Sequence, residues 1–490
     1  MEERIGLIDI GSNTIRLVIF GFTTETGLNE ILNIKTPARL SQYLTEDTKM
    51  NDEGIEVLKE ALRSFKKGAD KFDVQELHPI ATAAIRQSQN RDDIIKQIKK
   101  DLNIKIQIVP EEDEAFYGYY AISHTTDIEN GISVDIGGGS TEVTLFKDKK
   151  LKEAHSFPFG VVTLKRQFFG DKDHNDKPAI KSMEKFLSEQ FNQLDWLKDQ
   201  EIALVGVGGS ARNVARIHQS EHSYPIGGVH NYTMSLKDID EVYDIIRKSS
   251  RDDLTNLDGL SRDRVDIILP AVSVFKTLFK KIDATQFTFS RNGIREGYVM
   301  NLIRQHHPNE FKRDNVRQDA LRHLANEYNI EEDSANRRLK LAQSLLDQLL
   351  KHGNLKVSAQ EKALFVEGAY IYYLGSFIDS DSSSPHTYYL IANSMINGFS
   401  HKDRVKLALL ASFKNKSLLK FYVKETEWFS GKEVDTIQAL GGIIKFVNAL
   451  NISHTSFVEE VKLKEKKDDK YELYVYYKGE PIAEEYQANK

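Results

Sequence analysis

Hydrophobic and polar positions follow two different periods along the chain. Residues 5–20 and 131–146 each hold an apolar run that ends in aspartate, a short Gly/Ser/Thr/Asn turn and a second apolar run. This pattern predicts two β-hairpins with tight polar turns. Further strands are predicted at 77–82 and 104–109, and further helices at 54–71 and 91–100. Such a mixture of strands and helices indicates α/β lobes.

The two hairpins form an internal repeat. When Asp9 is placed over Asp135, the next two residues coincide as Ile and Gly, and Phe20 falls on Phe146 without a gap. Two unrelated Gly-rich turns are the alternative, because such turns are common. The shared residue order favours related loops, and we expect two similar lobes built around them.

Each hairpin loop has the composition of a phosphate site. Glycines let the backbone approach a phosphate and leave successive N–H groups free to point at it, while Ser and Thr add hydroxyl donors. Asp9 and Asp135 offer hard oxygen ligands that suit Mg²⁺. Two such loops facing each other would clamp a phosphate chain from both sides. The candidate phosphate-binding residues are Gly11, Ser12, Asn13, Thr14, Gly137, Gly138, Gly139, Ser140 and Thr141.

A third loop follows in residues 202–217, where a predicted strand passes through Gly208, Gly209 and Ser210 into a helix. A helix N-terminus after a glycine turn is a ready anion site. Many strand-to-helix turns look like this one, so the signal gains weight only from its place after the paired hairpins. Residues 286–300 likewise predict a strand, a turn and a helix.

An acidic turn supplies the catalytic candidates. Glu111 to Glu114 follow Pro110 and mark a helix start, where acidic side chains are also explained by the helix dipole alone. Hydrolysis of a phosphoanhydride needs a group that orients a water or takes its proton. Glu142, seven residues beyond Asp135, is a second candidate to hold metal or water, with a solvated strand residue as its alternative.

Composition limits the possible functions. The 490 residues predict about three or four domains. The chain has no cysteine, which excludes disulfides, thiolate metal sites and a cysteine nucleophile. No signal peptide and no apolar run of about 20 residues is evident, so we expect a cytoplasmic protein without a membrane partner. The net charge of −6 argues against broad polyanion binding, so recognition must come from loops, a metal ion or a confined basic patch.

Six segments in order resemble one protein family. They are DIGSNTIRLVI (9–19), ATAAIR (81–86), EEDEAFYGYYA (111–121), DIGGGSTEV (135–143), GVGGSARNVA (206–215) and GIREG (293–297). The chain is similar over residues 1–300 to the exopolyphosphatase and guanosine pentaphosphate phosphohydrolase (Ppx/GppA) family, within the actin, sugar kinase and heat-shock chaperone superfamily. The resemblance implies an α/β fold of two actin-like (ribonuclease H-like) lobes, at 1–127 and 128–303, with the active site between them.

The resemblance also implies roles for individual residues. Glu114, followed by Ala115, takes the place of the family's catalytic base. Asp135 and Glu142 match positions associated with a divalent metal and the attacking water, and Asp9 is a further metal candidate, so Mg²⁺ is the expected cofactor. Arg86 stands where the family places an arginine near the phosphate path, which suits bidentate contact. Arg39 is a weaker candidate of the same kind.

The second half predicts a different architecture. Residues 305–355 are helical in pattern and rich in basic residues, which form either a solvated face or a basic wall that guides polyphosphate. The basic residues are Arg304, Lys312, Arg313, Arg317, Arg322, Arg337, Arg338 and Lys340, with His306, His307 and His323. Helices should continue to about residue 450, and residues 457–481 predict two strands around a charged turn.

We divide this half into 304–430, a helical HD-like domain, and 431–490, a small α+β domain. Long family members carry a helical region similar to metal-dependent HD phosphohydrolases. Here residues 370–376 (YIYYLGS) lack the His-Asp pair expected at that place, and His386 is isolated. We therefore expect a binding and dimerising module without a second active site.

The function predicted first is an exopolyphosphatase that releases orthophosphate from polyphosphate ends with Mg²⁺. The close alternative is a guanosine pentaphosphate (pppGpp) 5′-phosphohydrolase with the same site chemistry. A kinase or ATPase of the superfamily, and a non-catalytic sensor of guanosine polyphosphates, are alternatives from other classes. The expected partners are polyphosphate or guanosine polyphosphates and a second copy of the chain through the C-terminal half, with no specific nucleic acid.

Overall fold

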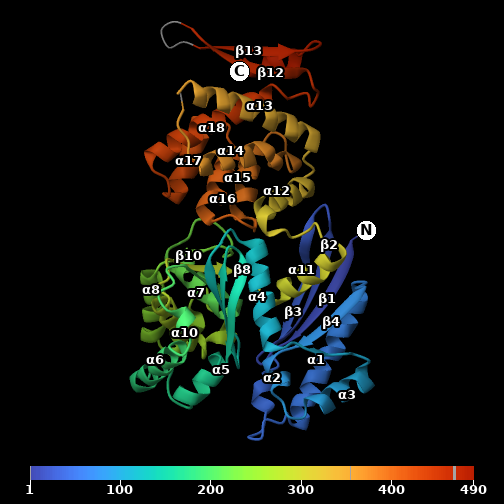
Figure 1. Cartoon of the computed structure of the whole chain (residues 1–490), viewed down its shortest axis with the longest axis vertical. Helices are drawn as coiled ribbons and strands as arrows, with labels where there is room; N and C mark the ends of the chain where they lie inside the picture. The colour runs from blue at the N-terminus through green and yellow to red at the C-terminus, as the bar shows by residue number, and fades with distance from the viewer. Residues whose placement is uncertain (1, 354, 467–470, 490) are drawn as a thin grey trace. The chain divides into compact units, whose positions relative to one another are not determined.

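The computed structural model describes residues 2–353, 355–466 and 471–489. The chain divides into two compact units (Figure 1). The first comprises Met1–Tyr224 and Val229–Val316, and the second comprises Pro225–Gly228 and Arg317–Lys490. We describe each unit by itself.

The first sheet of unit 1 contains the N-terminal hairpin. Its order is β3-β2-β1-β4-β5, in which β1, β2 and β3 run antiparallel and β4 and β5 are parallel to β1. The strands are β1 (Glu3–Ile10), β2 (Ile15–Thr23), β3 (Gly27–Thr36), β4 (Glu76–Ala81) and β5 (Gln107–Ile108). The strand predicted at 104–109 is shorter than expected. β5 lies at the sheet edge and pairs only with Ile80 and Ala81, while Ile104 and Ile106 turn into the core.

The second sheet repeats this plan. Its order is β10-β11-β9-β6-β7-β8, so that β8-β7-β6-β9-β11 matches β3-β2-β1-β4-β5 in sequence order and direction, with β10 added at the edge. The strands are β6 (Gly131–Ile136), β7 (Thr141–Lys147), β8 (Lys150–Phe157), β9 (Ala203–Val207), β10 (Thr233–Met234) and β11 (Phe287–Ser290). The two predicted hairpins and the internal repeat are confirmed.

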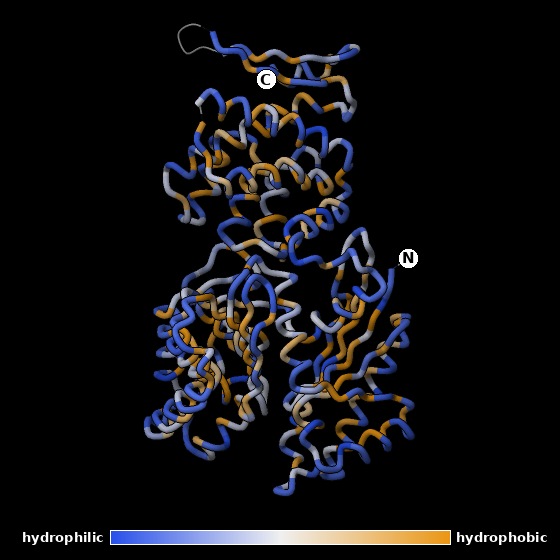
Figure 2. Tube along the Cα trace, in the orientation of Figure 1, coloured by the Kyte–Doolittle hydropathy of each residue, from blue (hydrophilic) through white to orange (hydrophobic). Residues whose placement is uncertain are grey.

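Amphipathic helices cover the sheets. Leu58, Leu62 and Phe65 of α1 pack with strand residues in the first lobe, and α1 starts where the Asn51 side chain accepts a hydrogen bond from the Gly54 N–H. Figure 2 shows apolar residues concentrated along the strands and alternating with polar residues along the helices. The first lobe holds α1 (Asp52–Lys71), α2 (Ala83–Arg86) and α3 (Arg91–Leu102). The second holds α5 (Val161–Leu164), α6 (Lys177–Phe191), α7 (Gly208–Glu221), α8 (Leu236–Lys248), α9 (Arg251–Asn256) and α10 (Ile268–Lys281).

Two helices are exchanged between the lobes. α4 (Glu111–Thr125) follows the first sheet along the chain, yet Tyr119, Tyr120 and Ile122 pack with residues of the second sheet. α11 (Ile294–His306) follows the second sheet, yet Val299 and Ile303 pack against the first. The two helices cross closely in Figure 1, and a Cβ added to Gly297 would meet the Tyr117 carbonyl. The lobes predicted as 1–127 and 128–303 are therefore interlocked.

Unit 2 is a group of helices followed by a small hairpin. Leu364 and Phe365 of α14, Leu407 of α16 and Ile444 of α18 belong to its buried core. The helices are α12 (Val316–Glu327), α13 (Glu332–Lys351), α14 (Ala359–Tyr370), α15 (Ser383–Asn393), α16 (His401–Ala411), α17 (Lys416–Thr426) and α18 (Gly431–Ala449), followed by β12 (Val458–Glu465), β13 (Tyr471–Tyr477) and α19 (Ile482–Ala488). The predicted helices up to about 450 and the closing strands are confirmed, and part of the predicted charged turn lies outside the described residues.

The unit boundary differs from the one we predicted at 304. Residues 304–316 stay with unit 1, because Arg313 donates to the Lys149 carbonyl at 2.9 Å and lies over the Tyr119 ring. The predicted division at 431 falls at the start of α18, which packs against α13, α14 and α16. The structure thus places α18 with the preceding helices.

Most arginines of the basic stretch 305–355 bind within their own unit. Arg317 makes a bidentate contact with Glu367, at 2.8 and 2.7 Å. Arg338 is buried and donates to the Ala369 and Tyr370 carbonyls. Arg337 donates to the His454 carbonyl at 2.6 Å. These side chains tie helices together, which contradicts the basic-wall hypothesis for them.

Within the described residues, no helix combines the length and the apolar character that crossing a membrane requires.

Candidate active site

A cleft of about 1170 Å³, including its open mouth, lies between the two lobes of unit 1. Both hairpin loops line it, together with the first turns of α7 and α11 and with Glu114 of α4. The loops lie against each other, since a Cβ added to Gly138 would stand 3.2 Å from the Cβ of Ser12. The sequence prediction that the paired loops face one another is confirmed.

The repeat places a different pair of side chains in each lobe. Asp9 lies opposite Arg16 across β1 and β2, whereas Asp135 lies opposite Glu142 across β6 and β7. Paired residues on neighbouring antiparallel strands project to the same face. The first lobe therefore presents a mixed acid–base pair to the cleft, and the second presents two carboxylates.

Glu114 stands in the first turn of α4 with 15% of its side chain exposed. Arg86 Nη1 donates to Glu114 Oε2 at 2.7 Å. Burial raises the pKa of Glu114 to about 7, and the negative charges of Asp135 and Asp9 add to the rise, while the bond from Arg86 opposes it. A carboxylate with this pKa suits a general base at neutral pH.

The other three carboxylates are also hard to ionise. Burial, with help from nearby negative charge, raises the pKa of Asp135 to about 6 and moves that of Glu142 well above its usual value. Burial likewise raises the pKa of Asp9, against the charges of Arg295 and Arg16. Glu142 is 5% exposed and accepts a hydrogen bond from Ser156 Oγ at 3.0 Å. The site concentrates carboxylates where solvent cannot screen them, which is typical of functional sites.

Arginines are the cleft residues that sequence analysis did not single out. The five that line the cleft are Arg16, Arg212, Arg264, Arg291 and Arg295. Arg212 Nε and Arg295 Nη1 are buried donors without a hydrogen-bond partner. Burial and the surrounding arginines lower the pKa of Arg212 to about 10. Buried donors are normally satisfied, so these atoms point to an anion that completes the site.

A signal for three of these arginines was present in the sequence. Arg16, Arg212 and Arg295 each follow a polar or glycine-containing turn within the segments DIGSNTIRLVI, GVGGSARNVA and GIREG. A guanidinium shortly after a phosphate-binding turn is placed to contact the same phosphate. Arg264 and Arg291 stand outside these segments, and folding alone brings them to the cleft.

Most predicted site residues line the cleft, and four do not. Those that line it are Asp9, Gly11, Ser12, Asn13, Thr14, Glu114, Asp135, Gly137, Gly138, Gly139, Ser140, Glu142, Gly208 and Gly209. Arg86 Nη1 donates to Glu114, with Glu111 3.3 Å away, and the Arg86 side chain is not among those that line the cleft. Thr141 Oγ1 donates to the Phe159 carbonyl at 2.7 Å, and Ser210 Oγ accepts from Arg264. The Arg39 backbone N–H donates to the Asn13 carbonyl at 2.9 Å and so supports the first loop.

Gly208 shows why the third loop needs glycine. Its φ is +83°, and a Cβ at this position would stand 2.7 Å from Asp135 Oδ1. Glycine accepts this conformation without steric cost. The first turn of α7 is thereby held against Asp135, which joins the third predicted phosphate loop to the carboxylates of the second hairpin.

The cleft carboxylates fit Mg²⁺. This ion is usually held by one or two carboxylates, with water and substrate phosphate completing its octahedron. Asp9, Asp135 and Glu142 line one cleft, and a cation beside them would offset the burial that raises their pKa values. In the described part of the chain, the only three metal-ligand atoms that lie within 4.8 Å of one another belong to residues outside the cleft. The cleft therefore offers an open site instead of an all-protein cage.

A family of phosphatases matches the two actin-like lobes and the region that follows them. The model of the Ppx/GppA phosphatase family matches residues 19–306, and the model of domain III of these phosphatases matches residues 316–478. The chain belongs to the Ppx/GppA phosphatase family.

Solved structures agree with this assignment. A Ppx/GppA family member from Aquifex aeolicus is 25% identical with a TM-score of 0.55, over 62% of this chain and 99% of its own length. A second Aquifex aeolicus structure, described as a PPX-GPPA enzyme, is 26% identical with a TM-score of 0.53, over 61% and 99%. An exopolyphosphatase from Cytophaga hutchinsonii, at 22% identity, a TM-score of 0.55 and 62% and 98% coverage, supports the fold.

Proposed function

We propose that this protein is an exopolyphosphatase that hydrolyses the terminal phosphoanhydride bond of inorganic polyphosphate and releases orthophosphate. One observation carries the proposal. Buried donors of Arg212 and Arg295 have no partner, and they line the same cleft as the glycine loops and Glu114. A chain of phosphates would satisfy these donors and bring its end to the carboxylate.

Binding falls to the loops and the arginines. Backbone N–H groups of the two hairpin loops would hold phosphate oxygens on both sides of the chain. The guanidinium groups of Arg212, Arg264 and Arg295 add charge inside a protein whose net charge is −6. The arginines gathered in the cleft therefore provide the local positive charge that a polyanion needs, although the net charge of the protein is negative.

The chemistry falls to Glu114. Water attacks the terminal phosphorus, the bridging P–O bond breaks, and the water proton passes to the Glu114 carboxylate. Arg86 holds Oε2 and leaves Oε1 to orient the water. Asp135 and Glu142, with Asp9 across the cleft, would hold Mg²⁺, which would offset the charge that develops on the phosphate oxygens. Mg²⁺ and the homodimer remain predictions.

The lining favours polyphosphate over a nucleotide. Among the described residues that line the cleft, the only aromatic is Phe289, and this residue is 2% exposed. A guanine base is commonly held by stacking on an exposed aromatic or guanidinium face, whereas a phosphate chain needs only donors and charge. Guanosine pentaphosphate stays the alternative substrate, since Arg291 is an exposed guanidinium at the cleft.

The proposal is tested by orthophosphate release from long polyphosphate, from guanosine pentaphosphate and from ATP, with Mg²⁺ and after chelation. We expect metal-dependent release that is fastest with polyphosphate. Faster release from guanosine pentaphosphate would indicate that this compound, and not polyphosphate, is the preferred substrate. ATP turnover without polyphosphate turnover would favour a kinase or ATPase, and tight binding without turnover would favour a sensor.

A further inference from the structure

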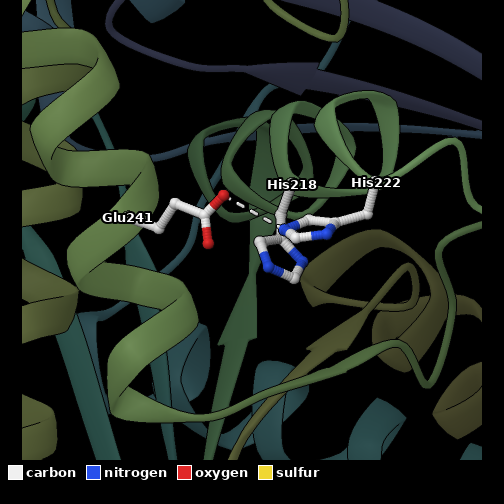
Figure 3. Close-up of side chains that lie close together, drawn as sticks. All are labelled: His218, His222 and Glu241. Atoms are coloured by element: carbon white, nitrogen blue, oxygen red, sulfur yellow. Dashed lines mark hydrogen bonds and ion pairs between the residues drawn. The ribbon is translucent and has the colours of Figure 1, made fainter.

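The C-terminal end of α7 carries two histidines on one face. His218 lies in the last turn of α7 and His222 is the residue that caps the helix, and the centroids of the two rings are 4.4 Å apart. Glu241 reaches toward them from the neighbouring helix α8 (Figure 3). One ligand atom from each of these residues lies within 4.8 Å of the other two, and within the described residues no other group of three metal-binding side chains does so.

His218 shows the need for a further partner. The residue is 7% exposed, and its Nε2 is buried without a hydrogen bond. Its Nδ1 lies 2.7 Å from the Tyr232 hydroxyl. When Nδ1–H donates to that hydroxyl, the lone pair on Nε2 is free to bind a metal, and the bond to Tyr232 fixes the ring orientation as a metal site requires. An unpaired buried nitrogen costs free energy unless something binds it.

His222 and Glu241 provide the open side of the cluster. His222 Nε2 lies 3.1 Å from Glu241 Oε1, and their side chains are 49% and 38% exposed. An ordinary surface ion pair would account for these two residues and contribute little to stability. It would leave His218 Nε2 without a hydrogen bond. Asp238 on α8 also lies near, with Oδ1 3.6 Å from His218 Nε2.

We propose that His218, His222 and Glu241 form a second metal site for a divalent transition metal of the zinc class, separate from the catalytic cleft. Two imidazole nitrogens and one carboxylate oxygen, with a position left for water or for Asp238, are a common Zn²⁺ ligand set. Imidazole ligands suit Zn²⁺ and select against Mg²⁺, which takes oxygen ligands. None of the three residues lines the cleft.

The site would tie α7 to α8. The first turn of α7 lines the cleft through Gly208, Gly209 and Arg212, and the proposed metal binds the opposite end of the same helix. A metal that binds only the folded chain stabilises it by mass action. The site thus acts as a clamp on the second lobe, and its occupancy does not depend on the proposed catalytic activity.

Zinc stoichiometry tests the proposal. The full-length protein is dialysed against micromolar Zn²⁺ with millimolar Mg²⁺ present, and bound zinc is measured by elemental analysis. We expect about one Zn²⁺ per chain. His222→Ala and Glu241→Gln remove exposed ligands without opening the core, and each should weaken Zn²⁺ binding at least about tenfold. His306→Ala, an exposed histidine in another helix of unit 1, and Glu142→Gln, in the cleft, should keep the zinc.

Two further readouts separate a metal site from a structural contact. Co²⁺ should give a visible absorption band in the wild type and in His306→Ala that is absent from His222→Ala. Zn²⁺ should raise the melting temperature of the wild type but not that of His222→Ala. Equal zinc content in wild type and His222→Ala, zinc that is lost only in Glu142→Gln, or a wild type that binds no zinc would overturn the proposal.

Discussion

Arg86 donates its Nη1 proton to Glu114 Oε2 at 2.7 Å, and it donates from the same nitrogen to the Val109 carbonyl at 3.0 Å. The guanidinium thus ties the start of α4 to the end of α2. It also opposes the burial that raises the pKa of Glu114 to about 7. The proposed base is held in place and tuned by one residue that does not line the cleft.

Removal of this guanidinium should shift the pH profile. In Arg86→Gln the charge that favours ionised Glu114 is lost, so the pKa of Glu114 rises further, by about one unit or more. The pH at which orthophosphate release reaches half of its maximum should move upward, and the maximal rate should fall because the carboxylate is less well oriented. The measurement is initial rate against pH at saturating substrate.

The matched control for Arg86→Gln is Glu111→Gln. Glu111 lies 3.3 Å from Arg86 at the more exposed end of the same contact. This variant should leave the profile nearly unchanged. An Arg86→Gln profile that coincides with the wild type would contradict the proposed tuning.

The wild-type rate should itself rise with pH around 7. A general base acts only when it is ionised, and Glu114 has a pKa of about 7, so kcat/KM should increase tenfold per pH unit below that value and level off above it. The residual activity of Glu114→Gln should lack this dependence. The check is kcat/KM for polyphosphate across pH 5 to about 9 at constant ionic strength.

The Asp135 carboxylate should lower the free energy of unfolding at neutral pH when no cation is bound. A carboxyl whose pKa is higher in the folded than in the unfolded chain makes stability fall as pH rises from the unfolded value to the folded value, here from 3.8 to about 6. At pH 7, Asp135→Asn should therefore raise the free energy of unfolding by about 1–3 kcal/mol while it abolishes activity.

Denaturant unfolding without divalent ions, at two pH values, measures this effect. Near pH 3 or below, where both states hold the Asp135 proton, wild type and Asp135→Asn should be similar. A variant that is less stable than the wild type at pH 7 would show that Asp135 makes stabilising contacts as an anion.

The unpaired cleft arginines should act on substrate binding. Arg212→Ala removes a guanidinium whose Nε has no partner within the protein, so folding stability should change little while KM for polyphosphate rises about tenfold or more. Arg216→Ala, an exposed position on the same helix, is the matched control and should change KM by less than about twofold. Steady-state kinetics of both variants measures the change in KM, and thermal unfolding measures the change in folding stability. Equal KM values for the two variants would remove Arg212 from the substrate path.

The sequence predicts what local pattern and repetition encode. The hairpins at 5–20 and 131–146 carry their own turns, and the structure brings their loops together as expected. The exchange of α4 and α11 between lobes was not predicted, because neither helix gathers its apolar residues on one face from which a packing partner could be inferred. Tertiary packing decides such a choice.

The missed arginines have a similar explanation. Arg264 reaches the cleft only through long-range folding, and nothing in its neighbours distinguishes it from a surface arginine, whereas Arg291 lies in the turn predicted within residues 286–300 and was not singled out there. Arg86 shows the converse limit. Its motif placed it near the phosphates, but only the structure shows that Glu114 is its partner.

The most direct test of the account separates binding from chemistry in Glu114→Gln. Polyphosphate affinity is measured by titration of the variant under conditions without turnover, and orthophosphate release is measured with the same preparation and Mg²⁺. We predict near wild-type affinity with release slowed by about a hundredfold to ten-thousandfold, the usual contribution of a general base. Release at the wild-type rate would show that Glu114 does not activate the water and would contradict the proposed mechanism.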